Sequence, residues 1–369
     1  MQKSVLVIAS VTDIAPAKYL IEEFKKTGCN LLVISDQNHG DVDIVKTKAV
    51  DLKKICYRKN FNPDLILFIE GGNMNLFPTN LEHFKCGKFW WGIDTPHDYK
   101  KHLLISRLFD HSFIAQKDYV AKLKEDGVNS VSWFPVAAPI SATDIISSDR
   151  KIDISYIGSQ NWKIYPDRKK LIDLISTKYK NIFIGSSSAN EMMRIYRDSK
   201  IVVNFSLKND VNMRIFEALG AGSLLLTNEI LGNGINELFE LKKDYDVYTS
   251  PENLLSQIDN YLNDDAQRLK ISSSGFVRVL GNHKDSDRAK EMLTYGFSKI
   301  SLRGNVLSDY SAALSAMNFY SDAFSLFIKD ARKNQKGLKS RIILAFLEFT
   351  AVPICFILKL IEKLSSKIK

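Results

Sequence analysis

Cysteine is scarce in this chain of 369 residues, which has four: Cys29, Cys56, Cys86 and Cys355. No two of them form a Cys-x-x-Cys pair, so the spacing argues against a zinc ribbon or a disulfide framework. Scattered cysteines are typical of proteins from the reducing cytosol. A signal peptide is not expected either, because the apolar run Val5–Ala9 is short and predicts a first strand instead.

Several catalytic signatures are also missing. The first strand continues as Ala9-Ser-Val-Thr-Asp-Ile14, without the Gly-x-Gly-x-x-Gly turn of dinucleotide-binding oxidoreductases. The sequence has no Walker A loop, no His-Glu-x-x-His motif and no Gly-x-Ser-x-Gly turn. These absences argue against P-loop nucleotide hydrolases, zinc peptidases and α/β-hydrolases.

The net positive charge is small outside the last 39 residues. The whole chain has a net charge of +9, but residues 331–369 contain nine Lys or Arg against Glu348 and Glu362. The remaining 330 residues therefore have a net charge of only +2. The basic character of the chain therefore belongs mostly to the tail, and the body shows no known nucleic-acid-binding motif, so no nucleic-acid partner is expected.

One long apolar run stands out near the C-terminus, at 342–358. It holds Glu348 and Pro353 and is flanked by the basic residues of the tail. Its 17 residues fall short of the roughly 20 that cross a bilayer. We expect residues 335–369 to lie on the membrane surface as an interfacial helix, with the protein attached to the inner face of the cell membrane from the cytoplasm. A buried C-terminal helix and a true membrane span remain the alternatives.

Strand-like and helix-like segments alternate in both halves of the chain, which predicts an α/β fold with two mostly parallel, doubly wound sheets. We predict strands at Val5–Ala9, Leu31–Ile34, Asp43–Val45, Leu65–Ile69, Lys88–Ile93, Phe113–Ala115, Val131–Phe134, Ile152–Ile157 and Ile182–Ile184. We predict helices at Ala15–Lys26, Asp51–Tyr57, Pro166–Tyr179, Asn190–Asp198, Pro251–Leu262, Asp265–Leu280 and Asp285–Ile300.

The composition also predicts the domain boundaries. Residues 137–150 are rich in Ala, Pro, Ser and Thr, as expected of a linker. The predicted parts are a Rossmann-like domain at 1–140, a linker at 141–150, a second Rossmann-like domain at 151–300, crossing helices at 301–334 and the basic apolar tail at 335–369.

The most informative stretch is 201–228, which predicts a strand, a polar loop, a short helix, a tight turn and another strand. Asn209 and Asp210 are candidates to cap the helix. Arg214 and Glu217 lie three residues apart and so share one helix face. The small residue Gly220 would let a ligand approach the backbone closely. A strand end beside a helix N-terminus is a common ligand site in open α/β sheets.

This stretch resembles the donor-binding segment of GT-B glycosyltransferases, through Asn212-x-Arg214-x-Phe216-Glu217-Ala-Leu-Gly220-Ala-Gly-x-Leu-Leu-Leu-Thr. It is most similar to the branch of the spore maturation protein CgeB. The resemblance covers roughly residues 60–295 and implies two Rossmann-like domains facing a cleft. It also implies a nucleoside diphosphate sugar as the donor, with Glu217 holding the ribose hydroxyls. Related enzymes often have a second Glu near the donor sugar, where this chain has Asn209.

Other candidate donor contacts follow from the same resemblance. Tyr156-Ile-Gly158-Ser159, with Arg168 ten residues after Gly158, is similar to the first turn of the second domain in this family. Backbone N–H groups and a cation there would hold a diphosphate. Arg214 is a second candidate for phosphate or base contact. Asn204 and Asn212 complete the predicted donor site.

The first domain supplies the candidate catalytic residues. Trp90-Trp-Gly-Ile-Asp94-Thr-Pro-His97 ends a predicted strand and resembles the Trp-x-x-Asp-x-Pro segment of CgeB-like proteins. Asp94 or His97 would contact the acceptor, or act as a base if the reaction inverts the sugar. A capping Asp and a surface His are the structural alternative.

No metal or other cofactor is expected. Asp-x-Asp occurs at 41–43, 244–246 and 285–287, but none of the three follows an apolar strand, where a GT-A glycosyltransferase would bind its metal. The resulting hypothesis is a metal-independent transferase that adds sugar to a glycan or lipid-linked glycan in surface polysaccharide synthesis. A nucleotide-sugar epimerase on the same fold and a non-catalytic scaffold at the membrane are the alternatives.

Overall fold

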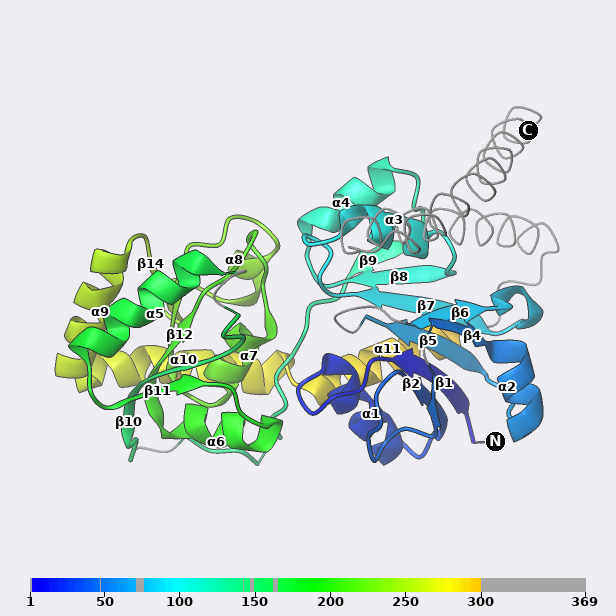
Figure 1. Ribbon diagram of the computed structural model, residues 1–369, viewed down its shortest axis with the longest axis horizontal. Helices are drawn as coiled ribbons and strands as arrows, with labels where there is room; N and C mark the ends of the chain where they lie inside the picture. The colour runs from blue at the N-terminus through cyan, green and yellow to red at the C-terminus, as the bar shows by residue number, and fades with distance from the viewer. Residues whose placement is uncertain are drawn as a thin grey trace, which may run out of the picture.

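The computed structural model describes residues 2–46, 48–70, 76–141, 143–146, 149–161 and 165–299. They form two lobes, each built around a parallel sheet, with a connecting segment between them (Figure 1). The predicted crossing helices at 301–334 and the predicted membrane-binding tail at 335–369 lie outside the described residues. Among the helices that are described, none is both long and apolar enough to cross a bilayer.

The N-terminal sheet has the strand order β3-β2-β1-β5-β7-β8-β9. Its strands are β1 (Ser4–Ala9), β2 (Asn30–Ser35), β3 (Ile44–Val45), β5 (Leu65–Ile69), β7 (Gly87–Gly92), β8 (His111–Ile114) and β9 (Val131–Trp133). All its pairings are parallel; β1, for example, pairs Val5 with Leu31 on one side and with Leu65 on the other. Both faces of the central strands are buried, which explains their nearly continuous apolar sequences.

Smaller elements complete the N-terminal lobe. They are the helices α1 (Pro16–Lys26), α2 (Leu52–Lys59), α3 (Tyr99–Ser106) and α4 (Asp118–Glu125), the 3-10 turn η1 (Leu81–His83), and a two-stranded sheet of β4 (Lys48–Asp51) and β6 (Leu76–Thr79). The helices α3 and α4 and the small sheet were not predicted, because their sequences lack the strong apolar runs that indicated the other elements.

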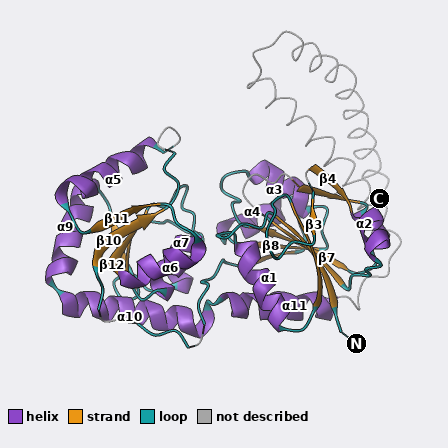
Figure 2. Cartoon of the chain, turned by 60° about the horizontal axis from the view of Figure 1, so that its bottom comes forward, coloured by secondary structure: helices purple, strands orange, loops and turns teal. Residues whose placement is uncertain are grey.

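The C-terminal sheet has the order β11-β10-β12-β13-β14. Its strands are β10 (Ile152–Ile157), β11 (Ile182–Gly185), β12 (Ser199–Asn204), β13 (Leu224–Asn228) and β14 (Asp246–Tyr248). The helices α5 (Pro166–Lys178), α6 (Ala189–Asp198), α7 (Met213–Gly220), α8 (Ile235–Leu238), α9 (Pro251–Asn263) and α10 (Asp265–Asn282) surround it (Figure 2). The predicted doubly wound α/β architecture is confirmed in both lobes.

The last described helix, α11 (Asp285–Lys299), crosses back to the N-terminal sheet. Its Tyr295 ring lies 4.5 Å from the ring of His111 on β8, and Gly296 lies against Leu65 of β5. The prediction that 151–300 form one domain is therefore wrong for this helix. The sequence predicted a helix at this position but did not identify the sheet against which it packs.

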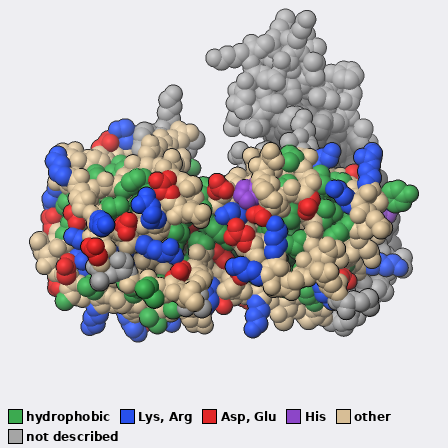
Figure 3. Space-filling model, turned by 90° about the horizontal axis from the view of Figure 1, so that it is seen from below, with side chains coloured by type: hydrophobic (Ala, Val, Ile, Leu, Met, Phe, Trp, Pro, Cys, Tyr) green, Lys and Arg blue, Asp and Glu red, His purple; other side chains and the backbone are tan. Residues whose placement is uncertain are grey.

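Two chain segments cross between the lobes side by side. The Ala138 N–H donates to His283 O at 2.9 Å, and the Asp285 N–H donates to Ala138 O at 3.1 Å. On the face in Figure 3, acidic and basic side chains are interspersed over both lobes. That face therefore shows no single-sign stripe, in agreement with the small net charge of the body.

Candidate active site

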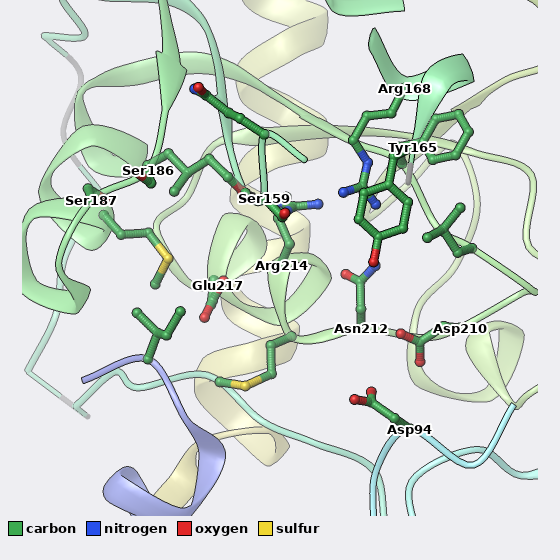
Figure 4. A pocket seen from close by; sticks show the side chains of 18 of the residues that line it. Asp94, Ser159, Tyr165, Arg168, Ser186, Ser187, Asp210, Asn212, Arg214 and Glu217 are labelled. Atoms are coloured by element: carbon green, nitrogen blue, oxygen red, sulfur yellow. Dashed lines mark hydrogen bonds between the residues drawn. The ribbon is translucent and has the colours of Figure 1, made fainter. Parts of the chain in front are cut away.

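A cavity of about 630 Å³ lies where the lobes face each other. The N-terminal lobe contributes Ile14, Asp94 and His97. The C-terminal lobe contributes residues that follow its strands or begin its helices, including Gly158, Ser159, Tyr165, Arg168, Ser186, Ser187, Met192, Asp210, Asn212, Arg214 and Glu217 (Figure 4). The cavity thus lies at the carboxyl ends of the parallel strands, where open α/β sheets bind ligands.

Arg214 is fixed in the wall of this cavity. Its Nε donates to Ile157 O at 2.8 Å, and its Nη1 donates to Asn204 Oδ1 at 2.8 Å. The guanidinium passes directly over Gly158, where a Cβ would collide with Nη2 of Arg214 and lie 2.8 Å from the Tyr156 hydroxyl. Gly158 is therefore required by the position of Arg214. Gly158 and Arg214, both predicted donor contacts, are therefore in direct contact in the wall of the cavity.

Arg168 lies beside Arg214 and is only 7% exposed. Its guanidinium carbon is 4.3 Å from the centre of the Tyr165 ring and 5.7 Å from that of Phe205. Within the described part of the chain, neither Arg168 nor Arg214 forms an ion pair with a carboxylate. Arg168 is buried and Arg214 is partly buried, and both line the cavity. Two such cations without carboxylate partners create a site for an anion.

Glu217 lies on α7, one turn after Arg214, where it lines the cavity and is 5% exposed. Burial raises the pKa of its carboxyl to about 7, although the nearby Arg214 charge acts in the opposite direction. Among the residues described here, no side chain donates a hydrogen bond to it. Arg214 and Glu217 share a helix face, as predicted, and Glu217 presents free acceptor oxygens to the cavity.

Asp210 reaches the cavity from the loop before α7, but it does not cap that helix. The N-cap is Asn212, without a side-chain bond to the first turn, so the capping prediction for Asn209 and Asp210 is wrong. Asp210 instead accepts a hydrogen bond from Gln116 of the other lobe. Burial, followed by the charges of Asp94 and Glu70, raises its pKa to about 8, so its carboxyl is protonated at neutral pH.

Three residues of the predicted donor site do not line the cavity. Asn209 adopts a left-handed conformation (φ 59°), and its Oδ1 accepts from the Leu231 N–H at 3.1 Å. Gly220 is packed against Ala138 and Ile140, so the core occupies the space predicted for a ligand. Asn204 is fully buried beneath the site, where it orients Arg214 and donates to Thr227 Oγ1 at 3.0 Å.

Asp94 faces the C-terminal lobe from the loop after β7, with Asp210 on the facing side of the cavity (Figure 4). Burial and the charge of Glu70 raise the pKa of Asp94 to about 6, and His102 opposes them. The group is therefore mostly ionised at pH 7. His97 is exposed as a residue, but partial desolvation of its ring, followed by the charge of Lys208, lowers the pKa of its imidazole.

The contributions of Gln116, Tyr165, Ser187, Glu70 and His102 were not predicted from the sequence. Gln116 and Glu70 each follow a buried strand of the N-terminal sheet, and that position is the signal that would have found them. In the chain as described, no group of three or more His, Cys, Asp or Glu side chains is arranged to hold a metal ion.

Residues 145–294 match the family described as Glycosyl transferase-like. Many solved structures have a similar fold, and three of them are described here. The chain has the GT-B fold. Sucrose-phosphate synthase from Thermosynechococcus elongatus gives a TM-score of 0.55 at 10% identity, over 82% of this chain and 100% of its own. HepE from Anabaena, in complex with UDP and glucose, gives a TM-score of 0.55 at 10% identity, over 80% of this chain and 99% of its own.

T4 phage BGT, in complex with UDP and Mn²⁺, gives a TM-score of 0.54 at 10% identity, over 80% of this chain and 99% of its own. No curated protein sequence matches the chain. The GT-B frame and the glycosyl transferase-like domain agree with the expected domain class, and the domain contains most of the cavity described above. The narrower resemblance to CgeB-like proteins stays a prediction.

Proposed function

We propose that the protein is a glycosyltransferase that transfers a sugar from a nucleoside diphosphate donor to a glycan or lipid-linked glycan acceptor. The observation that carries this proposal is the pair of Arg168, which is buried, and Arg214, which is partly buried. Both line the cavity without carboxylate partners, beside the free carboxylate of Glu217. One cavity therefore offers cations for a diphosphate and an acceptor for ribose hydroxyls. UDP is the probe of choice, because structural neighbours were solved with it.

The arrangement of side chains suggests how the donor lies. Ser187 and Glu217 are at one end of the cavity, the two arginines are in the middle, and Asp210 and Asp94 are at the other end (Figure 4). In the proposed complex the nucleoside lies beside Ser187 and Glu217. The diphosphate lies on the arginines, and the sugar points toward Asp94 and the N-terminal lobe.

The chemistry that we propose follows from the charges. Asp94, ionised at neutral pH, accepts the proton of the acceptor hydroxyl as that oxygen attacks the anomeric carbon of the donor sugar. The bond from the anomeric carbon to the diphosphate breaks, and the negative charge that develops on the leaving group is stabilised by Arg168 and Arg214. Attack by this route inverts the configuration of the sugar.

We further propose that this reaction requires no metal ion and that the tail at 335–369 keeps the protein at the inner face of the membrane, close to a lipid-linked acceptor. A polysaccharide pathway and a CgeB-like assignment belong to the same proposal. The cation pair supports metal independence because it supplies the charge that a divalent ion would otherwise provide.

Thermal unfolding in the presence of UDP, GDP, CDP and dTDP, with and without EDTA, tests the proposal. A nucleotide at 100 times its dissociation constant stabilises a protein by about 2.7 kcal/mol. The expected result is a rise in the unfolding temperature that EDTA does not remove. An assay of the product that the wild-type enzyme forms from UDP-glucose without acceptor then separates the two enzyme types: a transferase releases UDP by transfer to water, and an epimerase forms a second nucleotide sugar. No shift with any nucleotide would favour the scaffold alternative.

A further inference from the structure

A buried carboxylate outside the cavity holds the loop that carries Asp94. Glu70 directly follows β5 and is 4% exposed. Its Oε2 accepts from the Ile93 N–H at 2.5 Å and from the Asp94 N–H at 2.8 Å. Its Oε1 lies 3.0 Å from Nε2 of His102. Three polar groups therefore converge on one carboxylate, which is bonded directly to the backbone of the candidate base.

His102, on α3, supports the same loop from a second direction. Its ring is fully buried and lies edge-on to Trp90, with ring centres 5.4 Å apart. Its Nδ1 is 3.0 Å from the Thr95 hydroxyl, so the imidazole links Glu70 to the residue after Asp94. Gly92 lies so close that a Cβ there would be 3.0 Å from Nδ1 of His102. The start of the loop is thus enclosed on both sides.

These contacts serve the loop and not a ligand, because Glu70, His102 and Thr95 do not line the cavity. Among the described residues, the side chain that contacts the Glu70 carboxylate is the imidazole of His102, at 3.0 Å. A carboxylate charge so close to Asp94 makes it harder for Asp94 to lose its proton, and the raised pKa of Asp94 agrees with this effect. Across the cavity Asp94 faces Asp210, and Lys208 donates to Pro96 O on the same loop at 3.2 Å.

We infer that Glu70, held by His102, is a positioning residue for the proposed transferase: it fixes the Asp94 loop in the cavity and strengthens Asp94 as a base. This inference rests on the proposed function for its chemical consequence, but the fixing of the loop is a property of the folded chain alone. The two parts are therefore tested by separate measurements.

The first test is hydrogen exchange, measured by mass spectrometry, of the backbone amides in residues 92–98. Glu70→Gln removes the negative charge from the acceptor of the Ile93 and Asp94 N–H groups. Exchange in this segment is expected to become about 10-fold faster, as the loss of a charge-assisted hydrogen bond predicts. Asp110→Asn is the matched control, because Asp110 accepts from the Lys88 N–H at the opposite end of β7. It should leave the segment unchanged.

The second test is the pH profile of UDP release from UDP-glucose. Glu70→Gln should lower kcat by about 10- to 100-fold, within the range that a positioned base contributes. It should also move the rising limb of the profile to lower pH and leave UDP affinity unchanged. In an Asp94→Asn background, Glu70→Gln should cause no further loss, since Glu70 acts through Asp94.

Unchanged exchange in residues 92–98, or losses that multiply in the double variant, would overturn the inference. If the wild-type protein releases no UDP, the transferase proposal fails, and hydrogen exchange still decides whether Glu70 fixes the loop. His102→Gln provides a second variant if Glu70→Gln does not fold. It should increase exchange in the same segment.

Discussion

The side chain of Gln116 in the N-terminal lobe accepts a hydrogen bond from the backbone N–H of Val211 in the C-terminal lobe, at 3.0 Å. The same amide donates to the carboxyl of Asp210 through Nε2. One fully buried side chain therefore holds the loop that begins the donor segment. This amide therefore joins the two lobes beside the cavity that Asp210 lines.

Gln116→Ala should weaken both the fold and the ligand site. The substitution leaves the Val211 N–H and one oxygen of Asp210 without their partner, which costs about 1–3 kcal/mol for a buried group. We expect a lower unfolding temperature and about 10-fold weaker UDP binding by calorimetry. Gln37→Ala, at an exposed position of the same lobe, is the control. Equal UDP affinity in both variants would show that the contact between the lobes does not shape the site.

Gly158→Ala tests the close approach of Arg214. The added Cβ would displace the guanidinium from its bond with Ile157 O, so UDP affinity should fall by about 10-fold or more. Gly185→Ala is a matched control, because Gly185 is the neighbour of Ile157 in the sheet and a Cβ there meets only ordinary contacts, at 3.5 Å and beyond. Similar UDP affinity in the two variants would contradict the role given to Gly158.

Glu217→Gln should weaken donor binding and raise the stability of the ligand-free protein. Loss of a charged acceptor for the ribose hydroxyls predicts about 10-fold lower UDP affinity at pH 8. Because the pKa of Glu217 is about 7, the wild-type carboxyl is mostly ionised at pH 8, and a buried charge destabilises the folded state. The neutral amide should therefore raise the unfolding temperature without ligand. Glu191→Gln on α6 is the exposed control. A variant with full affinity would exclude Glu217 from the site.

Asp285→Asn gives a prediction for the pH dependence of stability. Burial and the charge of Glu217 raise the pKa of Asp285 from 3.8 to about 8 in the folded protein. The folded state therefore binds the proton more tightly than the unfolded state, and stability is lost as pH rises from about 4 through about 8. The variant cannot ionise there. Its unfolding temperature relative to the wild type should increase from pH 6 to pH 9, and a constant difference would contradict this account.

Much of the fold could be predicted because its strands are short apolar runs with both faces buried, as in β5 and β12. The shared helix face of Arg214 and Glu217 was also predictable, since it depends only on helix geometry. Contacts between distant segments were not. Gln116 and Val211 are 95 positions apart, and the polar residue after a strand resembles any loop residue.

The role of Asp210 illustrates the same limit. Its sequence position favours a helix cap, but its carboxyl is instead bonded by a residue of the other lobe. The family resemblance places Asn209 where related enzymes have a Glu near the donor sugar, but its left-handed backbone turns the side chain toward Leu231. Local sequence predicted that this loop is functional, while tertiary contacts decide which of its side chains reach the cavity.

The central claim is that Arg168 and Arg214 hold the diphosphate of a nucleotide donor. Calorimetric titration of the wild-type protein with UDP and with uridine, both in EDTA, tests it most directly. Two charge-assisted contacts at about 1.5–3 kcal/mol each predict that UDP binds at least about 100-fold more tightly than uridine. In Arg168→Leu, the difference should fall while uridine binding stays the same. Equal affinity for UDP and uridine, or no binding of either, would contradict the account.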